Sequence, residues 1–290
     1  MNVKYDKLVT EKINKKSNLL NQNNFIDIFL EDHNFIFHTL KKNKRKIFNA
    51  TKLFYNTYIS NNKIFFLGAG TSGRLGVIEA TEMRPTFGVR NNSIIGLMAG
   101  GNKALSKSIE GAEDDENKSK AELKKNKISK GDLVIGISAS GTSKYVLSAI
   151  NYCKLKKIKS IFLTCNAQKK KISDIDIIMN VGSEILAGST RLKSGTVTKI
   201  ALNMITTSAM LMAGKSLDGL MLDIRPTTDK LKARCINNLS LILKVNKKQS
   251  EKFLIESKWN LRIAIIMYKK KISYYQAKKN INNYLIEDLI

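Results

Sequence analysis

Residues 64–74 read Ile-Phe-Phe-Leu-Gly-Ala-Gly-Thr-Ser-Gly-Arg, a short apolar run that leads into a glycine-rich loop. Apolar residues at helical spacing follow at once, over Leu75–Met83. A buried strand, a glycine-rich turn and a helix in this order begin a parallel α/β unit. Backbone N–H groups at the start of such a helix favour an anion. The stretch therefore predicts an α/β fold with an anion-binding loop after its first strand.

Short apolar runs alternate with helical segments along the rest of the central chain. Strands that are buried on both faces read as continuous apolar runs, so we expect a doubly wound parallel sheet with helices on both faces. The expected strands are Ile64–Leu67, Ile94–Met98, Leu133–Ile137, Ser160–Thr164 and Ile175–Asn180. Helical spacing on either side predicts three parts: an N-terminal helical segment over residues 1–52, the α/β domain over 53–220 and a small C-terminal helical module over 230–290.

The first loop has the spacing GxGxxG, which is typical of dinucleotide-binding proteins. Such a site also needs an acidic residue at the end of the second strand, where it holds the ribose hydroxyls. Here the second strand ends in Leu97-Met98-Ala99-Gly100-Gly101, which contains no carboxylate. We therefore reject a nicotinamide cofactor.

A second loop rich in hydroxyl groups follows the third expected strand, at Ser138–Lys144. Serine and threonine in such a loop can simply cap a helix. However, the first loop also carries hydroxyls, at Thr71 and Ser72, and ligands of open α/β sheets bind at the carboxyl ends of the strands. Neither loop is a GxxxxGK[ST] nucleotide loop. The pair predicts a phosphorylated ligand that is held by hydroxyl and amide groups.

Composition narrows the class of partner. The formal net charge is +26, but only eight of the 50 Lys and Arg residues are arginines, and the lysines are scattered. Arginine is the residue that reads base edges and clamps phosphates, so we expect no specific nucleic-acid partner. Two histidines and three cysteines without CxxC spacing predict no metal site and buried thiols in a reducing compartment, which favours the cytoplasm.

The longest apolar stretch, Ile200–Gly214, is shorter than the roughly 20 residues that cross a bilayer. We therefore expect no membrane span. Apolar residues occupy nearly all sides of this stretch, which predicts that a second copy of the chain covers part of it in a homodimer. The alternative is that the C-terminal helices cover it within one chain.

Four stretches carry a family resemblance: Leu67–Gly88, Gly96–Gly101, Ile109–Asp114 and Gly188–Thr196. Together they resemble the N-acetylmuramic acid 6-phosphate etherase family, whose members have the sugar isomerase (SIS) fold that binds phosphosugars. The likeness covers nearly the whole chain. Glucokinase regulatory proteins share much of the pattern but are longer. This chain differs from the family pattern at Arg84-Pro85, where the family usually has Pro-Pro, and at Thr142-Ser143-Lys144, where the family has Arg-Thr-Pro.

The resemblance implies a lyase reaction. The family removes D-lactate from the 3-ether of N-acetylmuramic acid 6-phosphate, and water gives N-acetylglucosamine 6-phosphate. Two carboxyl groups carry out this chemistry, and no metal or organic cofactor is implied. Glu82 matches the acid that protonates the departing lactate, and Glu113 matches the second active-site residue, which we interpret as the C2 base. The alternative is that both are solvated charges on helix faces.

The resemblance also implies how the substrate is held. The implied phosphate ligands are Ser72, Ser138, Ser140 and Ser143, supported by Thr71 and Gly141. Arg191 and Lys193 could meet the phosphate or the lactyl carboxylate; the alternative for them is an internal ion pair with Glu184 or Asp223. Two further functions stay open: a phosphosugar-binding regulator without catalytic activity, and an aldose–ketose isomerase of the SIS type.

Overall fold

The computed structural model describes residues 8–15, 24–281 and 289. Two compact units are present, one formed by Met1–Thr81 with Asn92–Ser208 and the other by Glu82–Asn91 with Ala209–Ile290. The N-terminal helices belong to the same unit as the sheet, so the expected boundary at residue 52 does not coincide with a boundary between compact units.

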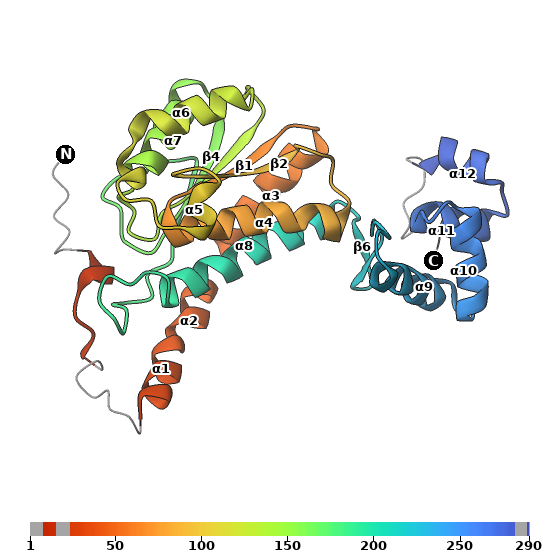
Figure 1. The fold of residues 1–290 in the computed structure, drawn as a ribbon, viewed down its shortest axis with the longest axis horizontal. Coiled ribbons are helices and arrows are strands. Elements are labelled where there is room, and N and C mark those ends of the chain that lie inside the picture. Colours follow the sequence, from red (N-terminus) through yellow and green to blue (C-terminus); the bar gives the residue numbers. More distant parts are fainter. Residues whose placement is uncertain (1–7, 16–23, 282–288, 290) are drawn as a thin grey trace. The chain divides into compact units, whose positions relative to one another are not determined.

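The first unit contains the expected parallel sheet (Figure 1). Its strand order is β2-β1-β3-β4-β5. Its strands are β1 (Ile64–Gly68), β2 (Ile94–Met98), β3 (Leu133–Ile137), β4 (Lys159–Thr164) and β5 (Ile175–Ile178). In the register, Gly68 lies beside both Met98 and Ile137. The loops that follow β1, β2 and β3 therefore lie together at the carboxyl ends of the strands.

Helices cover both faces of the sheet, as the continuous apolar strands predict. On one face, Phe65 and Leu67 pack with Tyr145 and Val146 in a fully buried cluster. These last two residues lie on α7 (Lys144–Leu155), beside α6 (Glu116–Lys125). The side chain of Phe66 points to the other face, because alternate residues of a strand face opposite ways.

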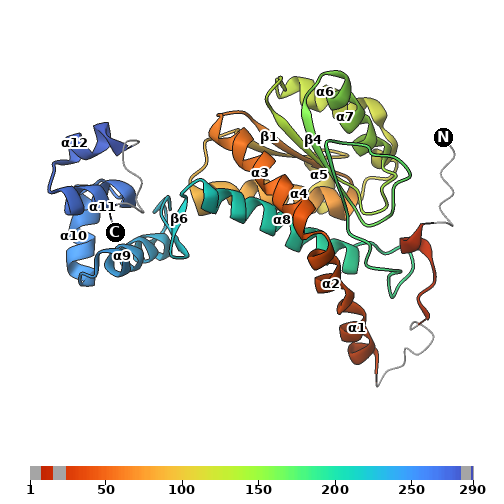
Figure 2. The same cartoon turned by 180° about the vertical axis from the view of Figure 1, so that it is seen from behind.

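The second face of the sheet is covered by α3 (Lys44–Ile59) and α4 (Gly70–Phe87), with α8 (Lys193–Met212) packed against α4 (Figure 2). The ring of Phe54 on α3 lies 6.2 Å from the ring of Phe66. At Gly76 of α4 an added Cβ would lie 3.1 Å from the Phe66 side chain, so the missing side chain helps α4 to lie close to the sheet.

Shorter elements complete the first unit: the 3-10 turn η2 (Val9–Glu11), α1 (Phe25–His33), α2 (Phe35–Lys42), α5 (Lys103–Ser106) and the 3-10 turn η4 (Ala112–Asp114). The side chain of Asn166, after β4, accepts a hydrogen bond from Val9 N at 2.8 Å and donates to the Thr10 hydroxyl at 3.0 Å. It also donates to the carbonyl of Ala139 at 3.1 Å, so one buried amide joins η2 to the loop after β3.

The second unit combines a hairpin with a helical module. The hairpin consists of β6 (Ser216–Leu217) and β7 (Leu220–Met221), and the module of α9 (Asp229–Leu243), α10 (Lys247–Glu256), α11 (Leu261–Lys270) and α12 (Tyr274–Lys279). Asp223 accepts hydrogen bonds from Lys215 at 2.8 Å and from Arg262 at 2.6 Å. Within the described ranges, no helix has both the length and the apolar character that a bilayer crossing requires.

Candidate active site

The loop after β3 is built around the Ser138 hydroxyl. Its Oγ accepts hydrogen bonds from the backbone N–H groups of Gly141 at 3.1 Å and Ser143 at 3.4 Å. Ser140 Oγ accepts from Thr142 N at 3.2 Å and lies 2.8 Å from Thr142 Oγ1. Amide groups thus converge on hydroxyl oxygens in the interior of the loop. A phosphate oxygen can accept from the same amides, and the hydroxyls can then donate to it.

Gly141 allows the loop to turn. Its φ of +76° is a conformation that residues with a side chain rarely adopt. An added Cβ would also lie 2.8 Å from Thr164 Oγ1. Only glycine fits there, which keeps Ser138 and Ser143 close to each other.

The loop after β1 lies against the loop after β3, residues 138–144, which we call the serine loop. Helix α4 begins at Gly70, so Thr71 and Ser72 occupy its first turn, where unpaired amides and the helix dipole favour an anion. Ser72 is buried, and its Oγ accepts a hydrogen bond from Ala139 N at 3.4 Å. The two loops that the sequence singled out are therefore joined directly.

A cavity of about 110 Å³ lies between the two loops; we call it the hydroxyl cavity. Its lining includes the predicted ligands Thr71, Ser72, Ser138, Ser140 and Ser143, together with Glu113 and Thr190. Thr190 was missed by the sequence reasoning, although it lies in the Gly188–Thr196 stretch. That reasoning selected the charged residues of the stretch and passed over its neutral hydroxyl group.

Glu113 reaches this cavity from η4, after β2. The hydroxyl of Ser143 donates to the carbonyl oxygen of Glu113 at 3.3 Å, which ties η4 to the serine loop. Asp115 caps α6 by accepting from the N–H groups of Asn117 and Lys118, both at 3.0 Å. The main chain of Glu113 is thus bonded to the loop after β3 and lies two residues before the cap of α6, while its side chain is exposed.

A second cavity of about 170 Å³ adjoins the first, because Ala69, Gly70 and Glu113 line both. We call it the cationic cavity. Its further lining residues are Arg74, Met98, Ala99, Ala104, Lys107, Ser108, Ile109, Glu110, Gly111 and Ala112. Glu113 therefore stands where a hydroxyl-lined cavity meets one that carries two cations.

Two glutamates on α4 have different surroundings. Glu79 is buried and accepts hydrogen bonds from Lys199 at 2.7 Å, Asn203 at 3.0 Å and Thr206 at 2.5 Å, all on α8. This carboxylate joins two helices. Glu82 lies three residues further along α4, in the stretch that belongs to the second unit, and its side chain is exposed.

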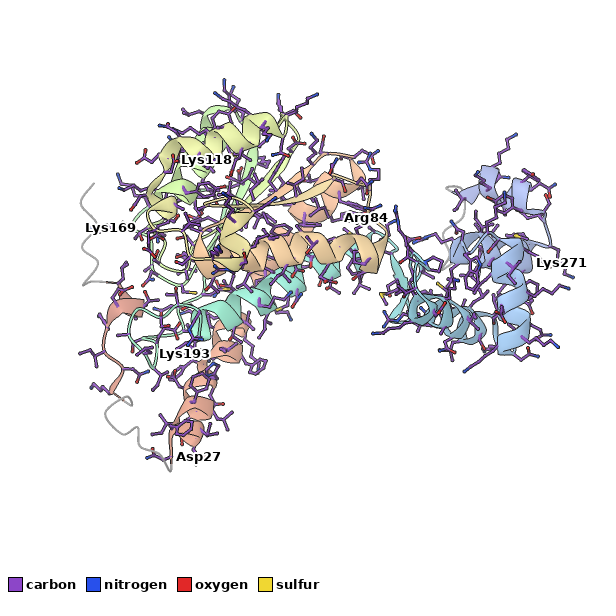
Figure 3. The ribbon with its side chains drawn as sticks, viewed as in Figure 1. Asp27, Arg84, Lys118, Lys169, Lys193 and Lys271 are labelled. Atoms are coloured by element: carbon purple, nitrogen blue, oxygen red, sulfur yellow. The ribbon has the colours of Figure 1, made fainter. Side chains whose placement is uncertain are left out.

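The structure corrects the role expected for Lys193. Its side chain is buried at the start of α8 (Figure 3), where Nζ lies 2.8 Å from Asp32 and 2.7 Å from the carbonyl of Ser183. This is an internal ion pair, as the alternative predicted, but with Asp32 in place of Glu184 or Asp223.

Glu184 instead accepts hydrogen bonds from the backbone N–H groups of Lys193 and Ser194, at 3.0 and 2.9 Å. Arg191 is exposed, and neither Arg191 nor Lys193 lines the two cavities. The structure therefore places neither predicted cation against the candidate phosphate loops.

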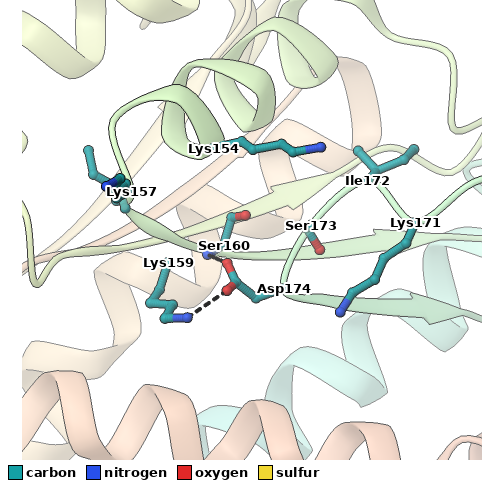
Figure 4. Close-up of a pocket in the computed structure, with 9 residues that line it drawn as sticks. Lys154, Lys157, Lys159, Ser160, Lys171, Ile172, Ser173 and Asp174 are labelled. Atoms are coloured by element: carbon teal, nitrogen blue, oxygen red, sulfur yellow. Dashed lines mark hydrogen bonds and ion pairs between the residues drawn. The ribbon is translucent and has the colours of Figure 1, made fainter.

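Another cavity, of about 440 Å³, lies at the amino ends of β4 and β5 (Figure 4). The two loops described above lie at the other end of the strands, their carboxyl end. Lysines 154, 157, 159 and 171 line it together with Ser160 and Asp174. Partial burial raises the pKa of Asp174, but hydrogen bonds from Lys159 and Ser160 N outweigh this effect and lower it overall. This cavity has no loop of convergent amides among its lining residues, so it does not resemble the hydroxyl cavity.

The described residues contain no group of three or more His, Cys, Asp or Glu side chains that could hold a metal ion. The three cysteines are free and buried. Burial raises the pKa of Cys153 and that of Cys165 to about 12, so both thiols stay protonated and unreactive near neutral pH.

Comparisons with known proteins agree with this geometry. The glucokinase regulatory protein N-terminal SIS domain family matches residues 46–154, and the SIS domain family matches residues 116–208. Among solved structures, the E. coli CFT073 protein c3406 is similar with a TM-score of 0.50 and 15% identity, over 69% of this chain and 97% of that one. The first unit therefore has the SIS fold.

Curated relatives cover almost the whole chain. The N-acetylmuramic acid 6-phosphate etherase of Mycoplasma mycoides is 40% identical over 92% of this chain and 90% of its own length. The protein of the same name from Francisella tularensis is 36% identical over 95% of this chain and 97% of its own. That from Staphylococcus epidermidis is 41% identical over 83% and 84%.

Proposed function

We infer the reaction of this site from one premise: the chain belongs to the N-acetylmuramic acid 6-phosphate etherase family and is a carbon–oxygen lyase. We propose that it cleaves the D-lactyl ether of N-acetylmuramic acid 6-phosphate by elimination followed by addition of water. The observation that carries this proposal is the hydroxyl cavity, in which Glu113 lies beside two hydroxyl-bearing loops.

The 6-phosphate occupies the hydroxyl cavity in this proposal. Its oxygens accept from the amides of Gly141 and Ser143, and from the hydroxyls of Ser72, Ser138 and Ser140. Thr71 and Thr190 complete the lining. The cavity has hydroxyls and helix N-terminal amides but no lysine or arginine, so the phosphate charge is stabilised mainly by oriented dipoles.

Two carboxyl groups carry the chemistry. Opening of the sugar ring gives an aldehyde at C1, which makes the C2 proton acidic. Glu113 removes that proton, a double bond forms between C2 and C3, and the C3–O bond breaks. Glu82 gives a proton to the departing lactate oxygen. Water then adds at C3 while C2 regains a proton, which gives N-acetylglucosamine 6-phosphate without a change of oxidation state.

One further reading is supported by an observation. Residues 46–154 match the N-terminal SIS domain family of glucokinase regulatory proteins, so binding of a phosphosugar without catalysis is the alternative function. Both readings predict binding of a 6-phosphate sugar, whereas only the etherase releases lactate.

The test is the release of D-lactate when the purified protein is incubated with N-acetylmuramic acid 6-phosphate. We expect stoichiometric lactate and N-acetylglucosamine 6-phosphate. Binding of the sugar phosphate without lactate release would support the regulatory reading instead. Conversion of an aldose phosphate to its ketose would support an isomerase.

We also propose that the protein acts in the cytoplasm as a homodimer, without an organic cofactor or metal. The buried free thiols suit a reducing compartment. Exposed apolar side chains on the consecutive helices α1 and α2, including Phe25, Leu30 and Phe37, support the dimer because a second copy would remove apolar surface from water.

A further inference from the structure

The proposed reaction uses the hydroxyl cavity, Glu113 and Glu82, and it assigns no role to Arg74 or Lys107 of the cationic cavity. The substrate that we propose has two anionic groups, the 6-phosphate and the lactyl carboxylate. The hydroxyl cavity suits the first. The two cations that the sequence suggested for the second are elsewhere, because Lys193 is paired with Asp32 and Arg191 does not line either cavity. The cationic cavity is lined instead by Arg74 and Lys107.

Arg74 is held in place by three backbone carbonyls. Its Nη2 donates to Ala104 O at 2.8 Å and to Lys107 O at 3.3 Å, and its Nε donates to Leu105 O at 3.1 Å. These bonds fix the guanidinium against the end of α5. The third nitrogen, Nη1, carries two more N–H donors. A cation fixed in this way loses little side-chain entropy when it binds an anion.

Lys107 follows α5 directly, and its backbone is held at both ends. Its N–H donates to Lys103 O at 3.1 Å, and its carbonyl accepts the bond from Arg74. The side chain itself is exposed. The bond from Arg74 therefore fixes the main chain of Lys107, which is itself part of the cavity lining.

The rest of the lining suits a small branched acid. Met98, Ala99, Ala104 and Ile109 supply apolar surface for a methyl group. Glu110 also lines the cavity, and its Oε1 accepts from Ser108 Oγ at 3.2 Å. With Glu113 the cavity has two carboxylates, so both cations are needed to offset the repulsion that a third carboxylate would meet.

We propose that the cationic cavity is the subsite for the lactyl group, in which Arg74 and Lys107 bind the lactyl carboxylate. Glu113, which lines both cavities, then lies between the two anionic groups of the substrate. The phosphate lies on one side of it and the lactyl ether on the other, so the C2 proton is presented to the carboxylate between them. This inference rests on the proposed function and adds the residues that distinguish the substrate from other 6-phosphate sugars.

The test compares two ligands that differ only in charge at the lactyl group: N-acetylmuramic acid 6-phosphate and its lactamide, in which a neutral amide replaces the carboxylate. Affinities are measured by calorimetry in a Glu113→Gln background, which slows turnover. We expect Lys107→Gln to weaken binding of the acid by about tenfold or more, as for a lost hydrogen bond to a charged group. Binding of the amide should change by less than about twofold.

Lys103→Gln is the matched control. It removes the same charge at a position four residues earlier, on α5, but Lys103 does not line the cavity. We expect it to leave the preference for the acid over the amide intact. Arg74→Lys keeps the charge but loses the fork of donors, so it should also reduce that preference, and N-acetylglucosamine 6-phosphate, which has no lactyl group, should bind it normally.

Equal effects of Lys107→Gln and Lys103→Gln would overturn the subsite, as would equal binding of acid and amide before either lysine is changed. Neither result would affect the etherase assignment, which depends on lactate release by the unmodified protein. Conversely, an unmodified protein that releases no lactate would refute the proposed function whatever its ligand preference.

Discussion

Glu113 combines a fixed main chain with an exposed carboxyl group, which suits a group that exchanges protons with a bound substrate and then with water. Glu82 is also exposed, whereas Glu79, one turn earlier on α4, is buried and fully engaged with α8. Of the two α4 carboxylates, only Glu82 is therefore available for chemistry.

We predict that Glu82→Gln and Glu113→Gln each reduce lactate release by at least about a hundredfold, the usual contribution of a general acid or base. Circular dichroism and thermal melting should be nearly unchanged, because neither side chain is buried. In deuterated water the Glu113 variant should lose exchange of the C2 proton, while the Glu82 variant can retain it. Normal turnover in either variant would exclude that residue from the mechanism.

The serine loop gives a second prediction. Ser138→Ala and Ser140→Ala should each weaken binding of a 6-phosphate sugar by about 1–3 kcal/mol, the range for hydrogen bonds to a charged group. Ser138→Ala should also lower stability, by about 1 kcal/mol, because its hydroxyl accepts two backbone amides of the loop. Calorimetric titration and thermal melting measure the two effects separately. Normal binding with early melting would show that the serines only cap the loop.

At the scale of elements, the strands could be predicted and the long-range pairings could not. The apolar runs at Ile94–Met98 and Leu133–Ile137 became β2 and β3 with the same bounds. Strand β3 is buried along its whole length, as a continuous apolar run predicts, whereas β2 is an edge strand and is half-buried over most of its length. The Lys193–Asp32 pair joins residues 161 positions apart, across α1 and α8. No local pattern in the sequence specifies which carboxylate pairs with a given lysine. The sequence therefore suggested Glu184 or Asp223, which are nearer to Lys193 along the chain.

The same pair supports a prediction about stability. We expect Lys193→Met to cost about 3–5 kcal/mol of unfolding free energy, since it leaves the carboxylate of Asp32 buried without its cation. The folded variant should still bind a 6-phosphate sugar normally. Lys159→Met is the control: its pair with Asp174 is on the surface, so the expected cost is below about 1 kcal/mol. If the folded Lys193→Met protein lost affinity for the sugar phosphate, Lys193 would have a role in binding after all.

At the scale of the whole chain, the three thiols report on folding. Burial raises the pKa of Cys235 to about 11 and that of the other two to about 12, so each has very little thiolate at pH 8. We therefore predict negligible reaction with a thiol reagent in the native protein and three equivalents after denaturation. Because thiolate forms as the pH rises, native reactivity should increase only in strongly alkaline solution. Rapid labelling of any thiol at pH 8 would contradict its burial.

Exposed apolar side chains in the first unit favour self-association of the chain. On α1 and α2, Phe25, Leu30, Phe35 and Phe37 are each about half exposed or more, at 48%, 63%, 54% and 67%. On α8, Met204 is 37% exposed, so the apolar stretch expected to be covered by a second copy is partly open. Burying such surface in a two-fold contact places each patch against its own copy.

We predict a homodimer of roughly 65 kDa, twice the 32.6 kDa chain, by light scattering at low micromolar concentration. Phe37→Glu, which puts a charge on one of the most exposed of these rings, should shift the protein towards the monomer, whereas Lys118→Glu on α6 should not. Mixing Glu82→Gln with Glu113→Gln protein then tests whether one site uses both subunits. If it does, subunit exchange restores both glutamates in some sites of the mixed dimers, and part of the lactate release returns. A fully active monomer at assay dilution would refute the dimer and leave the phosphosugar chemistry intact.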